Sequence, residues 1–200
     1  EIPIFPGAEG PLLGPQRQPQ APQAQALDRW PHQQQFPQGQ AVEFLRQTIR
    51  ANPGEVTLLA IGPLTNIACA IDRDPMFARN VRRLYVMGGE FRIGWPEHNF
   101  ACDVVATGAV LASGAPITIV PLDQTLKVAI DAHDVARIAS AHPLGALMAD
   151  QAQRFCQFLA GVNAGLPSDR SWAHDPLTLL AITSPHLFTL TPMQVEVADD

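Results

Sequence analysis

The stretch EVTLLAIGPLTNIACAID, residues 55–72, decides the fold class of this chain. Residues 56–61 are a short apolar run of strand length, which Gly62 and Pro63 interrupt. Apolar residues then recur at helical spacing over residues 64–71, and Pro63 suits the first turn of a helix. A buried strand that leads through a tight turn into a helix is typical of an α/β protein.

The same alternation continues along the chain. Residues 83–87 and 116–120 are further apolar runs of strand length, and Gly88-Gly89 makes a sharp turn after the first of them. Helices are expected over residues 40–51, from an N-cap at Asp103 through Leu111, and over 131–140, 144–160 and 175–183, with a closing strand over 194–197. The expected fold is therefore α/β, with a mostly parallel sheet flanked by helices in a Rossmann-like core.

The length of 200 residues suits one domain, which we expect to span residues 1–200 and to be incomplete at both ends. Residues 1–5 read as the end of a strand whose earlier part is missing, so the N-terminal strand is expected to be absent. Residues 16–40 are rich in Gln and Pro, and we expect them to form a long surface loop without regular structure.

Composition excludes several classes of partner. Thirteen Lys and Arg against nineteen Asp and Glu give a net charge of −6, which does not suit binding to a phosphate backbone, so no nucleic-acid partner is expected. No apolar run is long enough to cross a bilayer, so we expect no membrane association. Three widely spaced cysteines without a C-x-x-C pair, and no visible signal peptide, predict a reducing compartment, the cytoplasm.

Polar residues follow the expected strands, where ligands collect in open α/β sheets. Glu97 and Asn99 are two residues apart, and in an extended segment they project to the same side. A carboxylate beside an amide suits a vicinal diol, accepting from its hydroxyls and donating back. Taken alone, however, the pair is explained more simply as a solvated loop acid and a turn residue.

A second polar step, His174-Asp175-Pro176, opens an expected helix. One reading makes Asp175 a helix cap and leaves His174 an ordinary polar residue. The other makes Asp175 an oxygen ligand of a divalent cation and His174 a proton donor. Ile61 is similarly open: its turn is either a simple corner between strand and helix or a place where a backbone carbonyl meets a cation.

The order of these segments carries a resemblance that no single one carries. In sequence they are GPLTNIA (62–68), VMGG (86–89), PEHN with Asp103 four residues on, PLDQT (121–125) and HDP (174–176). The chain resembles the inosine-uridine preferring family of nucleoside N-ribohydrolases from about residue 1 to residue 200, most specifically over 55–125 and 172–190.

The resemblance implies an enzyme of purine and pyrimidine salvage. Members hydrolyse the N-glycosidic bond of ribonucleosides to ribose and free base, and Ca²⁺ orients the water and the ribose hydroxyls. By position, Glu97 and Asn99 match the residues that hold the ribose hydroxyls, and His174 matches a histidine that helps to protonate the departing base. Asp175 matches a calcium ligand through its carboxylate and Ile61 one through its main-chain carbonyl. A homo-oligomer is implied as well.

One departure from the family pattern bears on activity. The aspartate-rich motif D-x-D-x-x-x-D-D, which supplies most of the calcium carboxylates, does not occur in this chain. Because Ca²⁺ takes about six to eight oxygen ligands, we expect this chain alone to be inactive and its full-length form to be active. The alternatives are a non-catalytic nucleoside- or sugar-binding domain or degenerate family member, and an α/β scaffold that serves only assembly.

Overall fold

The computed structural model describes residues 2–162 and 170–198, and these divide into two compact units. The sheet unit comprises Glu1–Arg17, Phe36–Thr125 and His174–Asp200. The helical unit comprises Gln18–Gln35 and Leu126–Ala173. We predicted one domain over residues 1–200, and the division into two compact units does not test this prediction.

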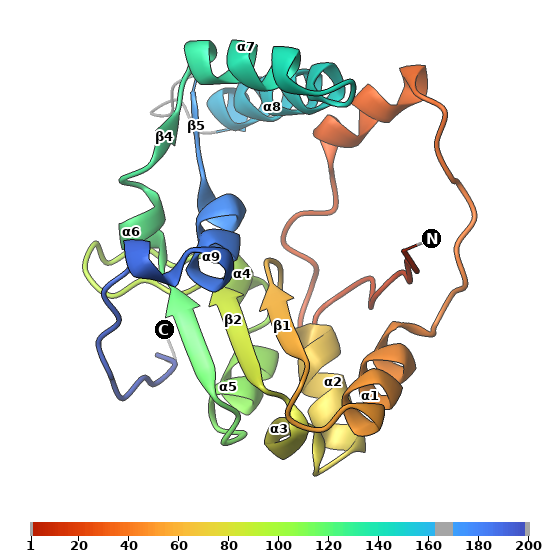
Figure 1. The fold of residues 1–200 in the computed structure, drawn as a ribbon, viewed down its shortest axis with the longest axis vertical. Helices are drawn as coiled ribbons and strands as arrows, with labels where there is room; N and C mark the ends of the chain where they lie inside the picture. Colours follow the sequence, from red (N-terminus) through yellow and green to blue (C-terminus); the bar gives the residue numbers. More distant parts are fainter. Residues whose placement is uncertain (1, 163–169, 199–200) are drawn as a thin grey trace. The chain divides into compact units, whose positions relative to one another are not determined.

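A parallel sheet forms the centre of the sheet unit (Figure 1). Its strands are β1 (Thr57–Ala60), β2 (Arg83–Met87) and β3 (Ile117–Val120), in the order β1-β2-β3. Thr57 lies opposite Arg83 and Leu84 opposite Ile117, so the carboxyl ends of all three strands lie at one edge. The predicted α/β class, with a parallel sheet flanked by helices, is confirmed.

Helices connect and flank these strands. They are α1 (Ala41–Ala51), α2 (Thr65–Arg73), α3 (Phe77–Asn80), α4 (His98–Cys102), α5 (Val104–Leu111), α6 (Leu122–Thr125), α9 (His174–Thr183) and the 3-10 helix η2 (Pro185–Leu187). Asp103 is the N-cap of α5, as predicted, because its carboxylate accepts a hydrogen bond from the Ala106 backbone N–H at 3.0 Å.

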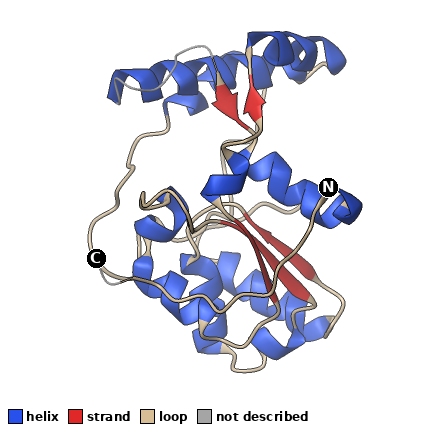
Figure 2. Cartoon of the chain, turned by 90° about the vertical axis from the view of Figure 1, so that its left-hand side faces the viewer, coloured by secondary structure: helices blue, strands red, loops and turns tan. Residues whose placement is uncertain are grey.

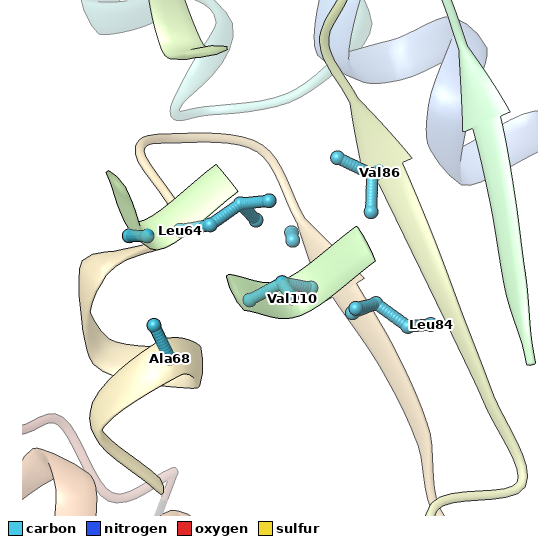
Figure 3. Close-up of a cluster of buried hydrophobic side chains, with 7 residues drawn as sticks. Leu64, Ala68, Leu84, Val86 and Val110 are labelled. Atoms are coloured by element: carbon cyan, nitrogen blue, oxygen red, sulfur yellow. The ribbon is translucent and has the colours of Figure 1, made fainter. Parts of the chain in front are cut away.

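The main hydrophobic core lies between α2, α5 and the sheet (Figure 3). Leu64 at the start of α2, Leu84 and Val86 on β2 and Val110 on α5 are all almost completely buried. Leu84 and Val86 are two residues apart and so face the same side of their strand. Full burial of each of these side chains contributes about 1.5–3 kcal/mol, which anchors the strand whose end carries the glycine turn.

Two expectations about the ends of the sheet unit differ from the structure. Residues 194–197, expected as a closing strand, pair with no strand among the described residues. Val195 and Val197 instead line a cavity of about 540 Å³ together with residues of α5. Their apolar side chains are therefore next to a helix and not at the edge of the sheet. Residues 2–5 likewise form no strand, and residue 1 lies outside the described residues.

The helical unit contains η1 (Pro22–Arg29), β4 (Ala129–Ile130), α7 (Ala132–Ala141), α8 (Gly145–Val162) and β5 (Ser171–Trp172) (Figure 2). Strands β4 and β5 pair antiparallel. The Gln- and Pro-rich segment was expected to lack regular structure, and over η1 this expectation is wrong. Pro22 occupies the first turn, where its missing N–H is no loss, and Ala26 is fully buried where η1 packs against α8.

Across the described ranges, no helix combines the length and the apolar character that a membrane crossing requires.

Candidate functional site

Three segments that directly follow the strands lie at the carboxyl edge of the parallel sheet. Ile61 directly follows β1, Gly88-Gly89 follows β2, and α6 follows β3. The Leu122 backbone N–H donates to the Gly89 carbonyl at 2.9 Å and so joins the second segment to the third. Helix α9 packs against β2 and α6, which brings its first residues to the same edge (Figure 1).

Glu97 is the N-cap of α4 and is only 5% exposed. Its Oε1 accepts from the Asn99 N–H at 2.8 Å, and its Oε2 accepts from the N–H groups of Gly89 and Phe100, both at 3.0 Å. The carboxylate therefore ties α4 to the glycine turn. The reading of Glu97 as a solvated loop acid is wrong, because the unpaired backbone N–H groups at the start of a helix attract a carboxylate.

Asn99 lies inside α4, so it is neither a turn residue nor part of an extended segment. Its side chain is 8% exposed, and its Nδ2 donates to the Met87 carbonyl at 3.0 Å and lies 3.4 Å from the Met87 Sδ. The bond to the carbonyl assigns the orientation of the amide. Because the amide hydrogens are directed at Met87, Oδ1 is the atom that can meet a ligand, as an acceptor rather than as the donor expected from the sequence.

Close packing of α4 on the glycine turn requires glycine at both positions. A Cβ built on Gly88 would collide with the ring of Phe100. Gly89 has φ +74°, a conformation that other residues rarely adopt, and its Cβ would lie 2.9 Å from the same ring. These contacts hold Glu97 and Asn99 close to the end of β2.

His174 is the first residue of α9 and is partly buried. Its Nδ1 lies 2.7 Å from the Oγ1 of Thr125, and its backbone carbonyl accepts from the Oγ1 of Thr178 at 3.2 Å. Burial lowers the pKa of the His174 imidazole, because the charged form loses solvation. Burial therefore favours the neutral form of the ring.

Asp175 lies within the first turn of α9 rather than before it, so it is not the helix cap of the alternative reading. Its carboxylate has no hydrogen-bond partner among the residues that the structure describes. Burial raises the pKa of Asp175, and the negative charge of Glu97 raises it further. The two carboxylates are therefore close enough to interact electrostatically.

The remaining predicted residue, Ile61, stands at the same edge with a side chain that is 44% exposed. Because Ile61 directly follows β1, its own backbone carbonyl lies at the strand end where ligands collect in such sheets. The structure thus brings Glu97, Asn99, His174 and Asp175 to the same edge, beyond the carboxyl ends of the strands, with Ile61 directly after the neighbouring strand β1.

Sequence reasoning missed two residues of α6. Thr125 is completely buried and contacts the His174 ring. Asp123 is 7% exposed, its Oδ2 accepts from the Gln124 Nε2 at 2.6 Å, and its buried Oδ1 has no partner among the described residues. The segment PLDQT after a buried strand was a signal for this turn, but nothing local in it shows which side chains point toward α9.

The described residues do not by themselves make a calcium site. They contain no group of three or more His, Cys, Asp or Glu residues placed to hold a metal ion. The Asp175 carboxylate and the Ile61 carbonyl are oxygen donors of the kind that calcium prefers, but two donors fall short of the usual six to eight or so.

Comparison with known proteins identifies the family. The family model described as inosine-uridine preferring nucleoside hydrolase matches residues 1–200. The pyrimidine-specific ribonucleoside hydrolase RihA of Citrobacter koseri is 32% identical over 168 residues, which cover 78% of this chain and 51% of that protein. Uridine nucleosidase 1 of Arabidopsis thaliana is 33% identical over 154 residues, which cover 74% of this chain and 45% of that protein.

Solved structures give the same result. A plant nucleoside hydrolase superposes with a TM-score of 0.80 at 25% identity, over 94% of this chain and 62% of the other. The purine-preferring ribonucleoside hydrolase from Gardnerella vaginalis gives 0.71 at 26% identity, over 84% and 54%. The chain spans about half the length of the curated relatives it matches. With its full length matched by the family model, the chain belongs to the inosine-uridine preferring nucleoside hydrolase family.

Proposed function

We propose that this chain carries the ribose-binding and leaving-group half of an active site that hydrolyses the N-glycosidic bond of ribonucleosides to ribose and free base. The observation that carries the proposal is the meeting of Glu97, Asn99, His174 and Asp175 at one sheet edge. Family membership supports the reaction class, and the names of relatives that act on uridine or on purine nucleosides make uridine and inosine the first substrates to test.

Each residue has a role that its contacts allow. The Asn99 Oδ1 accepts a hydrogen bond from a ribose hydroxyl, and the Glu97 Oε1 keeps a lone pair for another beside its bond to the Asn99 N–H. As the bond between C1′ and the base breaks, positive charge develops on the ribose ring, and the nearby carboxylates stabilise it. Water forms the new bond to C1′ and releases a proton. The base leaves with the bonding electrons and takes up a proton, and His174 assists by donating a hydrogen bond to the departing base.

We propose calcium as the metal of the complete protein, with Asp175 and the Ile61 carbonyl as two of its ligands. Calcium, when bound, would orient water and ribose hydroxyls, but these two donors alone do not make a full calcium site. We expect the 200-residue chain by itself to be inactive for this reason. A homo-oligomer, which the family resemblance supports, and a cytoplasmic location, which the cysteine pattern supports, complete the proposal.

The test compares two proteins in the presence of calcium. One is the 200-residue chain, and the other is the same chain extended at its N-terminus by the aspartate-rich segment of a full-length relative. Release of free ribose from uridine and inosine should stay at background for the first protein and rise with enzyme concentration for the second. An extended protein that binds uridine in calorimetry without releasing ribose would instead establish the non-catalytic alternative.

Asp175→Asn is the sharpest variant, because its carboxylate makes no hydrogen bond within the described residues and Asn has nearly the same shape. In the extended protein it should lower kcat/KM on the order of 100-fold, since it removes a charge that acts on the transition state. In the 200-residue chain it should leave the weak calcium affinity almost unchanged. Asp72→Asn, an exposed acid on α2, is the matched control and should change neither. Equal effects of Asp175→Asn on calcium affinity in both proteins would contradict the assignment.

A further inference from the structure

We infer that Thr125 is a positioning residue that, in the neutral form of His174, keeps the ring hydrogen on Nε2. This inference rests on the proposed function only for its catalytic consequence. In this arrangement the Thr125 hydroxyl donates a hydrogen bond to the His174 Nδ1.

The length of the contact favours one direction of the bond. The Thr125 Oγ1 and the His174 Nδ1 are 2.7 Å apart, which is typical of a hydroxyl donor, whereas ring N–H donors usually stand about 2.9–3.0 Å from their acceptors. The other acceptor within reach of the hydroxyl is the Leu122 carbonyl at 3.2 Å. The nearer acceptor therefore takes the hydroxyl hydrogen, and Nδ1 is left unprotonated.

The hydroxyl is held rigidly enough to fix the ring. Thr125 is completely buried, and its backbone N–H donates to the Pro121 carbonyl at 3.1 Å. Three residues before Thr125, the bond from the Leu122 N–H to the Gly89 carbonyl ties α6 to the glycine turn that Glu97 also holds. Of the two acceptors near this buried hydroxyl, Nδ1 makes the shorter contact, which favours the tautomer that leaves Nδ1 free to accept.

The consequence concerns the leaving group. A histidine with its hydrogen on Nε2 offers a donor to a departing base, whereas the opposite tautomer offers an acceptor there. Thr125 acts through His174 and does not itself touch the substrate. Its loss should therefore slow a reaction that needs a proton on the leaving group and spare one that does not.

The first test is spectroscopic and uses the 200-residue chain as it is. With ring-¹⁵N histidine, long-range ¹H–¹⁵N correlations at a pH where the rings are neutral report which nitrogen carries hydrogen, and His174→Gln identifies the His174 signals. The wild type should show Nε2 protonated and Nδ1 unprotonated but shifted by a hydrogen bond. Thr125→Val should move the Nδ1 signal toward that of an unbonded nitrogen, and Thr125→Ser should restore it.

Thr178→Val is the matched control, because Thr178 is also completely buried and its hydroxyl donates to the His174 carbonyl rather than to the ring. It should leave both ring signals in place. A wild-type ring with hydrogen on Nδ1, or a Thr125→Val spectrum identical to that of the wild type, would overturn the inference.

The second test uses the extended protein and compares two leaving groups. Thr125→Val should lower kcat for uridine about tenfold and leave kcat for 4-nitrophenyl riboside, whose leaving group needs no proton, within about twofold. An equal fall for both substrates would overturn the catalytic consequence. If the extended protein has no activity at all, the proposed function fails, while the spectra still decide the role of Thr125.

Discussion

Glu97 serves two purposes with one carboxylate. Its oxygens accept hydrogen bonds from three backbone N–H groups and so fix the start of α4 and the turn after β2, and its negative charge raises the pKa of Asp175. A substitution at Glu97 therefore removes a helix cap together with a charge. Asp175 has no such structural bonds among the described residues, so it reports on charge alone and is the better residue for testing function.

Substitution of two different glycines by alanine should change the stability of the protein in opposite directions. Gly88→Ala should destabilise the protein by about 1–3 kcal/mol, because the new Cβ collides with the Phe100 ring and α4 must move. Gly108 lies in the interior of α5 with nothing near its missing Cβ, so Gly108→Ala should stabilise by about 0.5–1 kcal/mol. Urea unfolding measures both, and shifts of the same sign would contradict this account of the glycine turn.

At the scale of elements, α7 shows how the sequence starts a helix. The Asp131 carboxylate accepts from the N–H groups of His133 at 2.8 Å and Asp134 at 3.0 Å, and Asp134 reaches back to the Asp131 N–H. This capping box satisfies backbone donors at both positions. The backbone hydrogen bond from Asp134 is the main reason that the pKa of Asp131 lies below its ordinary value.

This cap gives the stability of α7 a defined dependence on pH. Because the folded-state pKa of Asp131 is lower than the unfolded one, its ionised form stabilises the helix above the unfolded value of about 3.9, and the contribution is lost as pH falls through the folded value. The difference in thermal midpoint between wild type and Asp131→Asn should therefore shrink on acidification. Circular dichroism measures it, with the exposed Asp28→Asn of η1 as control. A difference that grows in acid would reverse the sign and refute the assignment.

At the scale of the sheet unit, Asp103 connects parts that are far apart in sequence. It is 2% exposed, and besides capping α5 it accepts from the Leu12 N–H at 2.8 Å and from the Thr65 hydroxyl at 2.6 Å. Leu12 is 91 residues away and Thr65 is 38 residues away. One buried carboxylate thus fastens the N-terminal segment and α2 to α5.

Loss of that carboxylate should affect the whole sheet unit. Asp103→Ala should destabilise it by about 3 kcal/mol or more, because it removes a cap and two further charge-assisted hydrogen bonds. Thr65→Val, which removes one of those bonds, should cost about half as much or less. Urea unfolding gives the energies, and faster hydrogen exchange at the Leu12 amide should appear only in Asp103→Ala. An unchanged Leu12 amide would show that the N-terminal segment is held in another way.

The sequence by itself determined the three strands of the parallel sheet, most of the α-helices and the family. Strand β1 and helix α2 follow from the run at residues 56–61, the break at Gly62-Pro63 and the spacing after it, because these signals act between near neighbours in the chain. The cap at Asp103 could also be predicted, because its carboxylate bonds to a backbone N–H only three residues away. The order of the short segments along the chain was enough to identify the family, which the match over residues 1–200 confirms.

Only the tertiary structure decided what the polar groups do. Glu97 is a buried cap rather than a solvated acid because the glycine turn, eight residues away, supplies an N–H to it. Thr125 meets His174 across 49 residues, and residues 194–197 lie against α5 instead of joining the sheet. These outcomes depend on which donors, acceptors and apolar faces folding brings together, and spacing along the chain contains no information on contacts between distant segments.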